Sequence, residues 1–324
     1  MVRRVPSDAA PYRSPEQPSV PDHRGERQAD SVFVIPSDPS IGPLLSAWSN
    51  QTRDGFRLVR SLARARVVSG VIFGGFLLLF TFAFYQAFGA IAGAAFGAAG
   101  AAGLAAFLVL AFRPRPWCSY VGEDGMSDHR FARSGPRHRF LRFGEVEGLW
   151  IARTDHIENG FYRHTVVEYS WRDAAGRVLL SDKLISVERG VAAAGARLGA
   201  RLAGTVLGND PNRAWIEAGE ERWTSLRRAR ARAHLAEAGA ATFPLRGGGY
   251  LAVRPGEIEI FSVGKRTSLR AADVASSSWK DSVLTIQPRE GGSRAAVSLR
   301  AADVGDLAVA IETMRETAGI DVAG

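Results

Sequence analysis

The sequence is poor in cysteine and in lysine. Its single cysteine, Cys118, excludes an intrachain disulfide framework and a cysteine-rich zinc site, and it agrees with a reducing compartment. Only three of the 41 basic residues are lysines, namely Lys183, Lys265 and Lys280. The average composition, 46% hydrophobic and 23% charged, excludes a collagen and a wholly disordered chain. A length of 324 residues is sufficient for about two domains.

The formal net charge of +8 has two explanations. A surplus of arginine attracts anionic lipid or nucleic acid, whereas a GC-rich genome produces the same surplus without any function. Much of the surplus lies beside a long apolar segment. This position argues for a membrane surface and against nucleic acid as a partner.

Residues 1–43 are rich in proline and have no hydrophobic pattern. Eight of the 15 prolines fall in this segment, separated mainly by Ser, Asp, Arg and Gln. Such a segment buries too little apolar surface to offset the entropy lost on folding, so we predict a disordered cytoplasmic tail. No apolar stretch follows Arg3 and Arg4 closely, and we therefore expect no secretory signal peptide.

Residues 67–112 contain no charged side chain. As one helix these 46 residues would extend about 69 Å, against a ~30 Å hydrocarbon core. We therefore predict two membrane spans, Val67–Ala87 and Ile91–Phe112, joined by a tight turn near Tyr85–Ile91. A buried helix pair of a soluble protein usually carries charge on at least one face. No ionisable residue lies within the spans, which favours an anchor over an ion or proton pathway.

Arginines flank both ends of this hairpin, whereas its turn has no charge. The candidate membrane-interface residues are Arg53, Arg57, Arg60, Arg64, Arg66, Arg113 and Arg115. By the positive-inside rule, both ends of the chain then lie in the cytoplasm. Residues 44–66 form a basic segment in which Phe56, Val59 and Leu62 follow a helical spacing. Two interpretations stay open: an amphipathic helix on the membrane surface, or arginines that only set the topology.

Glycines recur at intervals of four residues in the hairpin. They include Gly70 and Gly74 in the first span, and Gly89, Gly93 and Gly97 at the start of the second. Small residues at this spacing let helices approach closely. We therefore expect the spans to pack on each other or on a second copy of the chain, which would make a homo-oligomer.

After Arg115 the pattern changes to short strands separated by turn residues. Residues 113–210 and 243–324 each predict about six strands and one closing helix. The predicted closing helices are Val191–Val206 and Val304–Thr317. Between the two regions, residues 211–242 predict a helical linker. Its arginines either contact lipid head groups or nucleic acid or form a solvated face, and we favour the solvated face.

The two strand-rich regions share short motifs. Each has a glycine turn (GEDGM, RPGEI) and, further on, an acidic residue before valine and then tryptophan (GEVEGLW, AADVASSSW). Glu257–Ser262 follows the second of these turns and alternates strictly, as a strand does. We predict an internal duplication of one small β-domain. An identical heptapeptide, Ser268–Val274 and Ser298–Val304, is attributed instead to chance in an Ala- and Arg-rich chain.

With these motifs, residues 116–324 resemble bacterial pleckstrin-homology-like (PH-like) domains. The whole chain is similar to uncharacterised bacterial membrane proteins that carry two such domains behind an anchor. The resemblance implies an α+β membrane protein, in which a two-helix transmembrane hairpin precedes two small PH-like β-barrel or sandwich domains, each closed by a C-terminal helix. It also implies the inner membrane of a bacterium, and it carries no catalytic residues.

Motifs for catalysis and for cofactors are missing from the sequence. It contains no G-x-x-x-x-G-K-[ST], no G-x-S-x-G and no H-E-x-x-H, so we expect neither an enzyme nor a cofactor. His156 and His164, with Asp155 and Glu158, form the only cluster of histidines and acids. We favour a solvated hairpin tip over a metal site there, because the spacing follows no known ligand pattern.

These features together predict a membrane-anchored, non-enzymatic binding module on the cytoplasmic side. Its expected partner is a protein, a peptide or an anionic lipid head group close to the bilayer. The alternative is a structural scaffold, in which the glycine-rich spans oligomerise and the β-domains bind no ligand.

Overall fold

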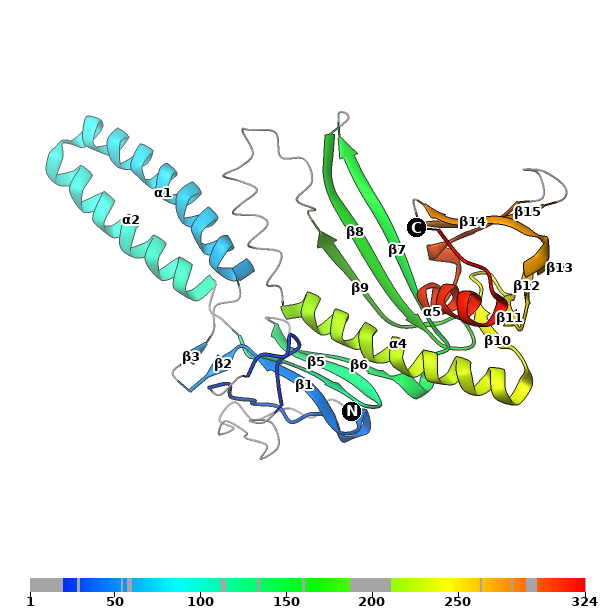
Figure 1. Ribbon diagram of the computed structural model, residues 1–324. Helices are drawn as coiled ribbons and strands as arrows, with labels where there is room; N and C mark the ends of the chain where they lie inside the picture. Colours follow the sequence, from blue (N-terminus) through cyan, green and yellow to red (C-terminus); the bar gives the residue numbers. More distant parts are fainter. Residues whose placement is uncertain are drawn as a thin grey trace.

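The computed structural model contains two long apolar helices and several antiparallel sheets (Figure 1). It describes residues 20–27, 30–53, 55–56, 60–111, 115–132, 135–158, 161–186, 211–262, 264–280, 282–289 and 296–323. The predicted α+β class is therefore confirmed. The apolar helices stand apart from the sheets in Figure 1, and the longest remaining helix runs between the strands β7–β9 above it and β1, β5 and β6 below it.

The apolar helices are α1 (Arg60–Phe88) and α2 (Ala90–Ala111), which form an antiparallel pair. Both are long and apolar enough to cross a membrane, over Ser69–Phe88 and Ala90–Leu108. Only Gly89 separates them, and its φ of +84° is a left-handed conformation that glycine adopts without strain. The two predicted helices are confirmed, with a turn shorter than predicted.

Glycines of α2 lie directly against α1. A Cβ atom on Gly93 would meet Tyr85 Cβ at 2.8 Å, and one on Gly97 would meet Thr81 Cγ2 at 2.9 Å. Larger side chains at these positions would push the helices apart. Of the two roles expected for the glycine spacing, packing within one hairpin is the one that these contacts support.

The first β unit consists of two antiparallel sheets and a helix. Its sheets have the strand orders β1-β4-β5-β6 and β7-β8-β9. The strands are β1 (Leu44–Ser49), β4 (Trp117–Gly122), β5 (Gly125–Ala132), β6 (Gly135–Arg142), β7 (Gly148–Glu158), β8 (Phe161–Arg172) and β9 (Val178–Ser186). The helix α4 (Pro211–Ala238) shares one hydrophobic core with both sheets.

The second β unit has sheets of order β10-β11-β12-β13 and β14-β15-β16. The strands are β10 (Ala241–Pro244), β11 (Tyr250–Arg254), β12 (Glu257–Ser262), β13 (Lys265–Arg270), β14 (Val274–Lys280), β15 (Val283–Pro288) and β16 (Val297–Arg300). The closing helix α5 (Leu307–Thr313) continues into a π-helical turn, Met314–Ala318. It begins three residues later than predicted because Val304 is drawn into a β-bridge with Leu245.

The two units have the same order of elements. In each, four antiparallel strands lead through a 3₁₀ turn, Phe143–Glu145 or Ala271–Asp273, to three antiparallel strands and a helix. The valines after these turns have nearly the same backbone angles, with φ −85° and ψ 128° at Val146 and φ −84° and ψ 123° at Val274. The paired acid-valine motifs of the sequence therefore lie at corresponding points of the two units.

The apolar hairpin of α1 and α2 lies within the first unit and not in front of it. In the second unit, a short turn over residues 245–249 joins β10 to β11, whereas α1 and α2 separate the corresponding strands β1 and β4. β1 nevertheless pairs with β4, with Ala47 opposite Tyr120 and Ser49 opposite Cys118. The predicted domain start at residue 113 is therefore wrong. A strand of six residues beside a proline- and glycine-rich segment gives too short a pattern to recognise.

Residues 44–66 do not form one amphipathic helix. β1 is followed by a second pair of short strands, β2 (Gln51–Thr52) and β3 (Gly55–Phe56), and α1 begins only at Arg60. Phe56 pairs with Gln51 as part of β3, whereas Leu62 lies on α1, so these two residues do not share one helix. Whether those side chains touch lipid is outside what the structure describes, because it gives no side-chain exposure for residues 54–68.

The N-terminal segment covers one face of the first sheet. Phe33 and Ile41 are buried in a cluster with Cys118 and Tyr120. His23 bridges the Oγ atoms of Ser46 at 2.8 Å and Ser119 at 2.9 Å, and burial lowers its pKa to about 3. The predicted disorder is wrong for residues 20–27 and 30–43, and residues 1–19 lie outside the described part. Phe33 and Ile41 are isolated apolar residues between prolines, so they give no periodic pattern in the sequence. They are buried because they pack on a face of the first sheet.

α4 is a core helix and not the predicted solvated linker. Its buried residues recur every four positions, at Trp215, Gly219, Trp223, Arg227 and Ala231. The buried face is hard to recognise in the sequence, because a glycine and an arginine are part of it and charged residues occupy the other faces of the helix. The other predicted closing helix, Val191–Val206, lies outside the described residues.

The identical heptapeptides have the same local structure. Ser268–Val274 and Ser298–Val304 each contain the end of a strand and a 3₁₀ turn. The arginine before each turn is extended, with φ −76° and ψ 147° at Arg270 and φ −79° and ψ 148° at Arg300. Whatever the origin of the repeat, both copies serve as strand exits.

Candidate functional site

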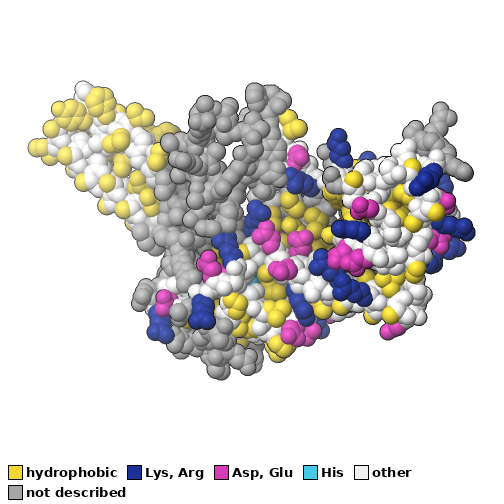
Figure 2. Space-filling model, viewed as in Figure 1, with side chains coloured by type: hydrophobic (Ala, Val, Ile, Leu, Met, Phe, Trp, Pro, Cys, Tyr) yellow, Lys and Arg dark blue, Asp and Glu magenta, His cyan; other side chains and the backbone are white. Residues whose placement is uncertain are grey.

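A groove of about 490 Å³ lies between the two units. Strands β7 and β8 line one side of it, α5 lines the other side, and α4 contributes Glu220 and Thr224. This volume is in the range of ligand-binding pockets. Figure 2 shows hydrophobic side chains over the β7–β9 sheet, with acidic side chains beside them. The groove is lined by Leu149, Ile151, Arg153, Val167, Tyr169, Glu220, Thr224, Trp279, Ser282, Ala301, Val304, Asp306, Leu307, Ala308, Val309 and Ile311.

Strand alternation builds one wall of the groove. Ile151 on β7 lies opposite Tyr169 on β8, and Arg153 lies opposite Val167. Because alternate residues of a strand point to the same face, these four side chains form one surface. α5 forms the other wall, and the walls are mainly aliphatic. Such a surface suits apolar parts of a ligand.

Glu220 of α4 supplies a carboxylate to the groove. Burial raises its pKa, and a hydrogen bond from the Tyr169 hydroxyl lowers the pKa in part. The neighbouring Glu217 is more exposed and pairs with Arg213 at 2.6 Å. Within the described residues, no lysine or arginine forms an ion pair with Glu220. The groove also contains a basic side chain, Arg153, so its lining carries charges of both signs.

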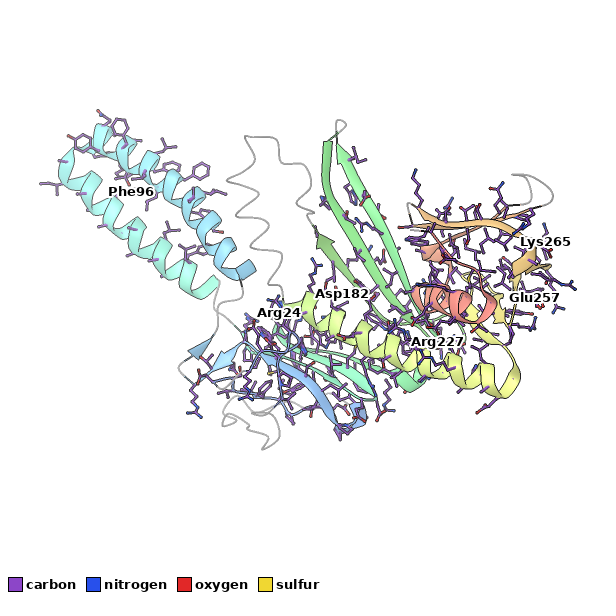
Figure 3. The ribbon with its side chains drawn as sticks, viewed as in Figure 1. Arg24, Phe96, Asp182, Arg227, Glu257 and Lys265 are labelled. Carbon is purple, nitrogen blue, oxygen red and sulfur yellow. The ribbon has the colours of Figure 1, made fainter. Side chains whose placement is uncertain are left out.

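A buried ion pair holds the two units together beside the groove. The Asp306 carboxylate accepts hydrogen bonds from Arg227 Nε at 2.9 Å, Trp223 Nε1 at 2.5 Å and the Leu149 amide at 3.0 Å. Asp306 belongs to the second unit, whereas the three donors belong to the first. Arg227 lies on α4 where this helix passes under α5 (Figure 3). Its second nitrogen donates to the Thr242 carbonyl at 2.6 Å.

Burial also affects the protonation of Asp306 in this ion pair. It raises the pKa of Asp306 to about 6, although Arg227 and the other donors pull in the opposite direction. The Arg227 side chain is only 5% exposed and that of Asp306 only 2%. Removing one partner would leave the other charge in a site without water.

A second cluster of charges lies at the start of α4. Asp128 accepts from Arg130 Nε at 2.8 Å and from Arg139 Nε at 2.9 Å. Arg139 also pairs with Asp182 of β9, which Figure 3 places above the first turns of α4, and it donates to Asn212 at 2.7 Å. Two arginines thus face two aspartates. We interpret these ion pairs and hydrogen bonds as interactions that fasten the first sheet to β9 and to the start of α4.

The seven predicted membrane-interface arginines lie around the two connections to the hairpin. Arg53 and Arg115 are exposed; Arg60, Arg64 and Arg66 lie on α1 but their side chains are outside the description, and Arg57 and Arg113 are outside the described residues. Asn50 joins the two connections, because its Nδ2 donates to the Arg115 carbonyl at 2.7 Å and its Oδ1 accepts from the Trp117 amide at 2.9 Å. Arg115 therefore lies beside Asn50, where the chain leaves β1 and enters β4.

The remaining candidates of the sequence do not form a site. His156 and His164 stack across β7 and β8 with ring centroids 4.5 Å apart. Among the described residues no three His, Cys, Asp or Glu side chains are placed to hold a metal ion. Cys118 is buried, and burial raises the pKa of its thiol, which keeps it protonated.

Comparison with protein-family models and with curated proteins gives no match for this chain.

Neither the groove nor the buried ion pair between Asp306 and Arg227 can be recognised from the sequence. Glu220 is one acid among several on a charged helix, and Asp306 falls in the first turn of the predicted helix Val304–Thr317, where an acidic residue is common. Their roles depend on how the second unit packs on α4 and β7. The four-residue spacing of Trp215, Trp223 and their neighbours is the one pattern that could have identified α4 as buried.

Proposed function

We propose that this chain is a membrane-anchored, non-enzymatic binding protein that holds a segment of another polypeptide in the groove between its two β units. The groove carries the proposal: it combines aliphatic walls, a volume of about 490 Å³ and a few polar groups at its floor and rim. Its mainly aliphatic walls suit the apolar side chains of a peptide better than the charged head group of a lipid.

The anchor supports a role close to the bilayer. Because α1 and α2 are inserted between β1 and β4, two short connections hold the first unit near the membrane. With arginines at both connections, we place both termini and both β units in the cytoplasm of a bacterial cell. The matching order of elements supports two PH-like domains that arose by duplication. Arg53 and Arg115 are the described residues that we expect to contact anionic lipid.

A displayed library of random peptides tests the binding function. The full chain in lipid nanodiscs selects peptides, and each is then measured against Ala308→Trp, in which an indole fills the rim of the groove. We expect affinity for the variant to fall by about tenfold or more, or about 1.4 kcal/mol. Ala236→Trp on α4 is the matched control, because Ala236 is exposed and does not line the groove. Peptides that bind wild type and Ala308→Trp equally would place binding elsewhere, and a library without binders would contradict the proposal.

The scaffold alternative has less support. It relied on glycines that are free to meet a second copy, whereas Gly93 and Gly97 are in contact with Tyr85 and Thr81 of the same hairpin.

A further inference from the structure

We propose that the free end of the β7–β8 hairpin contacts the surface of the bilayer in which α1 and α2 are anchored. The chain then meets the membrane at two separate places. The residues that we assign to the second contact are Ile157 of β7 and Ile185 of β9. This inference rests on the proposed membrane anchor and does not depend on the peptide-binding groove.

The β7–β8 hairpin extends beyond the third strand of its sheet. β9 ends at Ser186, which lies opposite Thr165 of β8, and Thr165 lies opposite Asp155 of β7. Beyond these residues β7 and β8 continue as a ribbon of two strands, as far as Glu158 and Phe161. A ribbon of two strands is only marginally stable in water by itself. A surface that covers the ribbon would therefore stabilise it.

The free end of this sheet exposes large aliphatic side chains. Outside α1 and α2, the described part of the chain exposes four large hydrophobic side chains, and two of them lie here. Ile157 is 67% exposed and Ile185 is 52% exposed. Such side chains gain free energy when they leave water. The hairpin tip that the sequence predicts to be solvated thus carries apolar groups that a less polar surface would accept.

The β7–β8 hairpin points to the side of the molecule on which the anchor lies. In Figure 1 this hairpin and the α1–α2 hairpin both rise above the level of α4, and Figure 2 shows hydrophobic side chains at the upper end of the β7–β9 sheet. The 11 residues of β7 extend about 36 Å. The part of α1 that precedes its span, residues 60–68, extends only about 14 Å. β7 is therefore long enough to reach a bilayer that α1 enters at Ser69.

The described charges below the tip favour neither anionic nor cationic lipid. Arg153 pairs with Asp155 at 3.7 Å, and Lys183 pairs with Glu168 at 3.3 Å. Because these charges balance, burial of the two isoleucines is the attraction that we assign to the contact. The open edges of the ribbon cannot enter the hydrocarbon core, since their backbone groups would lose water. The tip therefore lies at the level of the head groups.

A fluorescent dye at the tip tests this contact in the full chain. Ile157→Cys is labelled with an environment-sensitive dye and reconstituted into phosphatidylcholine vesicles that carry a nitroxide near the head group or deep in the acyl chain. The matched control is Ala174→Cys, because Ala174 is exposed in the β8–β9 turn at the other end of the sheet. The wild-type chain measures background labelling, because its single cysteine is buried.

We expect the head-group nitroxide to quench the dye at Ile157→Cys about twofold or more compared with Ala174→Cys, because the tip reaches the interface and the turn does not. Ile185→Cys should behave like Ile157→Cys. Addition of anionic phosphatidylglycerol should leave the quenching unchanged. A contact that forms only with anionic lipid would overturn the assignment to apolar burial.

Leu79→Cys on α1 separates this inference from the proposed anchor. Leu79 lies within the apolar span and is 69% exposed, so the deep nitroxide should quench a dye there. Quenching at Leu79→Cys, together with equal and weak quenching at Ile157→Cys and Ala174→Cys, would overturn the second contact and leave the anchor intact. The absence of quenching at Leu79→Cys would overturn the anchor and this inference with it.

Discussion

Arg227→Met lowers the free energy of unfolding by about 3–5 kcal/mol, which is the usual cost of removing one partner from a buried ion pair. The methionine keeps most of the aliphatic stem of Arg227 but leaves the Asp306 carboxylate without its cation in a site that is closed to water. The lost hydrogen bond to the Thr242 carbonyl adds to the effect. Denaturant unfolding of the full chain in detergent micelles, followed by tryptophan fluorescence, measures the change.

Arg228→Met is the matched control for this substitution. Arg228 is the next residue of α4 and pairs with Glu312 at 2.6 Å, but its side chain is 47% exposed. Exposed pairs contribute about 0–1 kcal/mol, so we expect little change. The double variant Arg227→Met with Asp306→Asn should recover a large part of the loss, because it leaves no charge in the site. Equal effects of the two single variants would contradict a buried ion pair between the units.

The pH dependence follows from the raised pKa of Asp306. The folded chain protonates this group near pH 6, whereas the unfolded chain does so near 3.8. Between these values the folded state binds more protons than the unfolded state, so this group favours folding as the pH falls and disfavours it as the pH rises. The deficit of Arg227→Met should therefore shrink from pH 7 toward pH 5.

Trp215→Ala has a second large expected effect, a loss of about 3–5 kcal/mol in the free energy of unfolding. Trp215 is fully buried between α4 and the strands, and its indole Nε1 donates to the Tyr120 carbonyl at 3.2 Å. Alanine leaves a cavity and an unpaired carbonyl at the centre of the first unit. The same denaturant unfolding measures the loss.

The control for Trp215→Ala is Arg213→Ala, two residues earlier on α4. Arg213 is paired with Glu217 at the surface, and its loss should cost less than about 1 kcal/mol. If α4 were a solvated linker, as its charged sequence suggests, Trp215→Ala would cost no more than Arg213→Ala. That result would remove α4 from the core of the first unit.

The sequence predicts those parts of the fold that depend on local patterns. The chargeless run gives α1 and α2, and strict alternation gives β12 over Glu257–Ser262 with the bounds that the structure has. β1 and α4 could not be assigned in this way, because their place depends on partners far along the chain: Ser49 meets Cys118 across the whole hairpin, and Trp215 meets Tyr120. The groove depends in addition on the contact between the two units. One such contact joins Leu149 to Asp306, which are 157 residues apart in the sequence.

The central claim is that the apolar hairpin of α1 and α2 interrupts a β-hairpin of the first unit, so that β1 pairs with β4 across it. Ser49→Cys tests this claim most directly, because Ser49 lies opposite the single native cysteine, Cys118, with Oγ and Sγ 3.6 Å apart. Directly opposed strand residues have Cα distances that a disulfide spans. Trp48→Cys is the control, because alternation turns the neighbouring side chain to the other face.

After oxidation of the full chain in membranes, mass spectrometry should find an intrachain disulfide between residues 49 and 118 in Ser49→Cys and none in Trp48→Cys. The absence of a disulfide in Ser49→Cys, or equal cross-linking of both variants, would contradict the pairing of β1 with β4 and the insertion of α1 and α2 into the first unit.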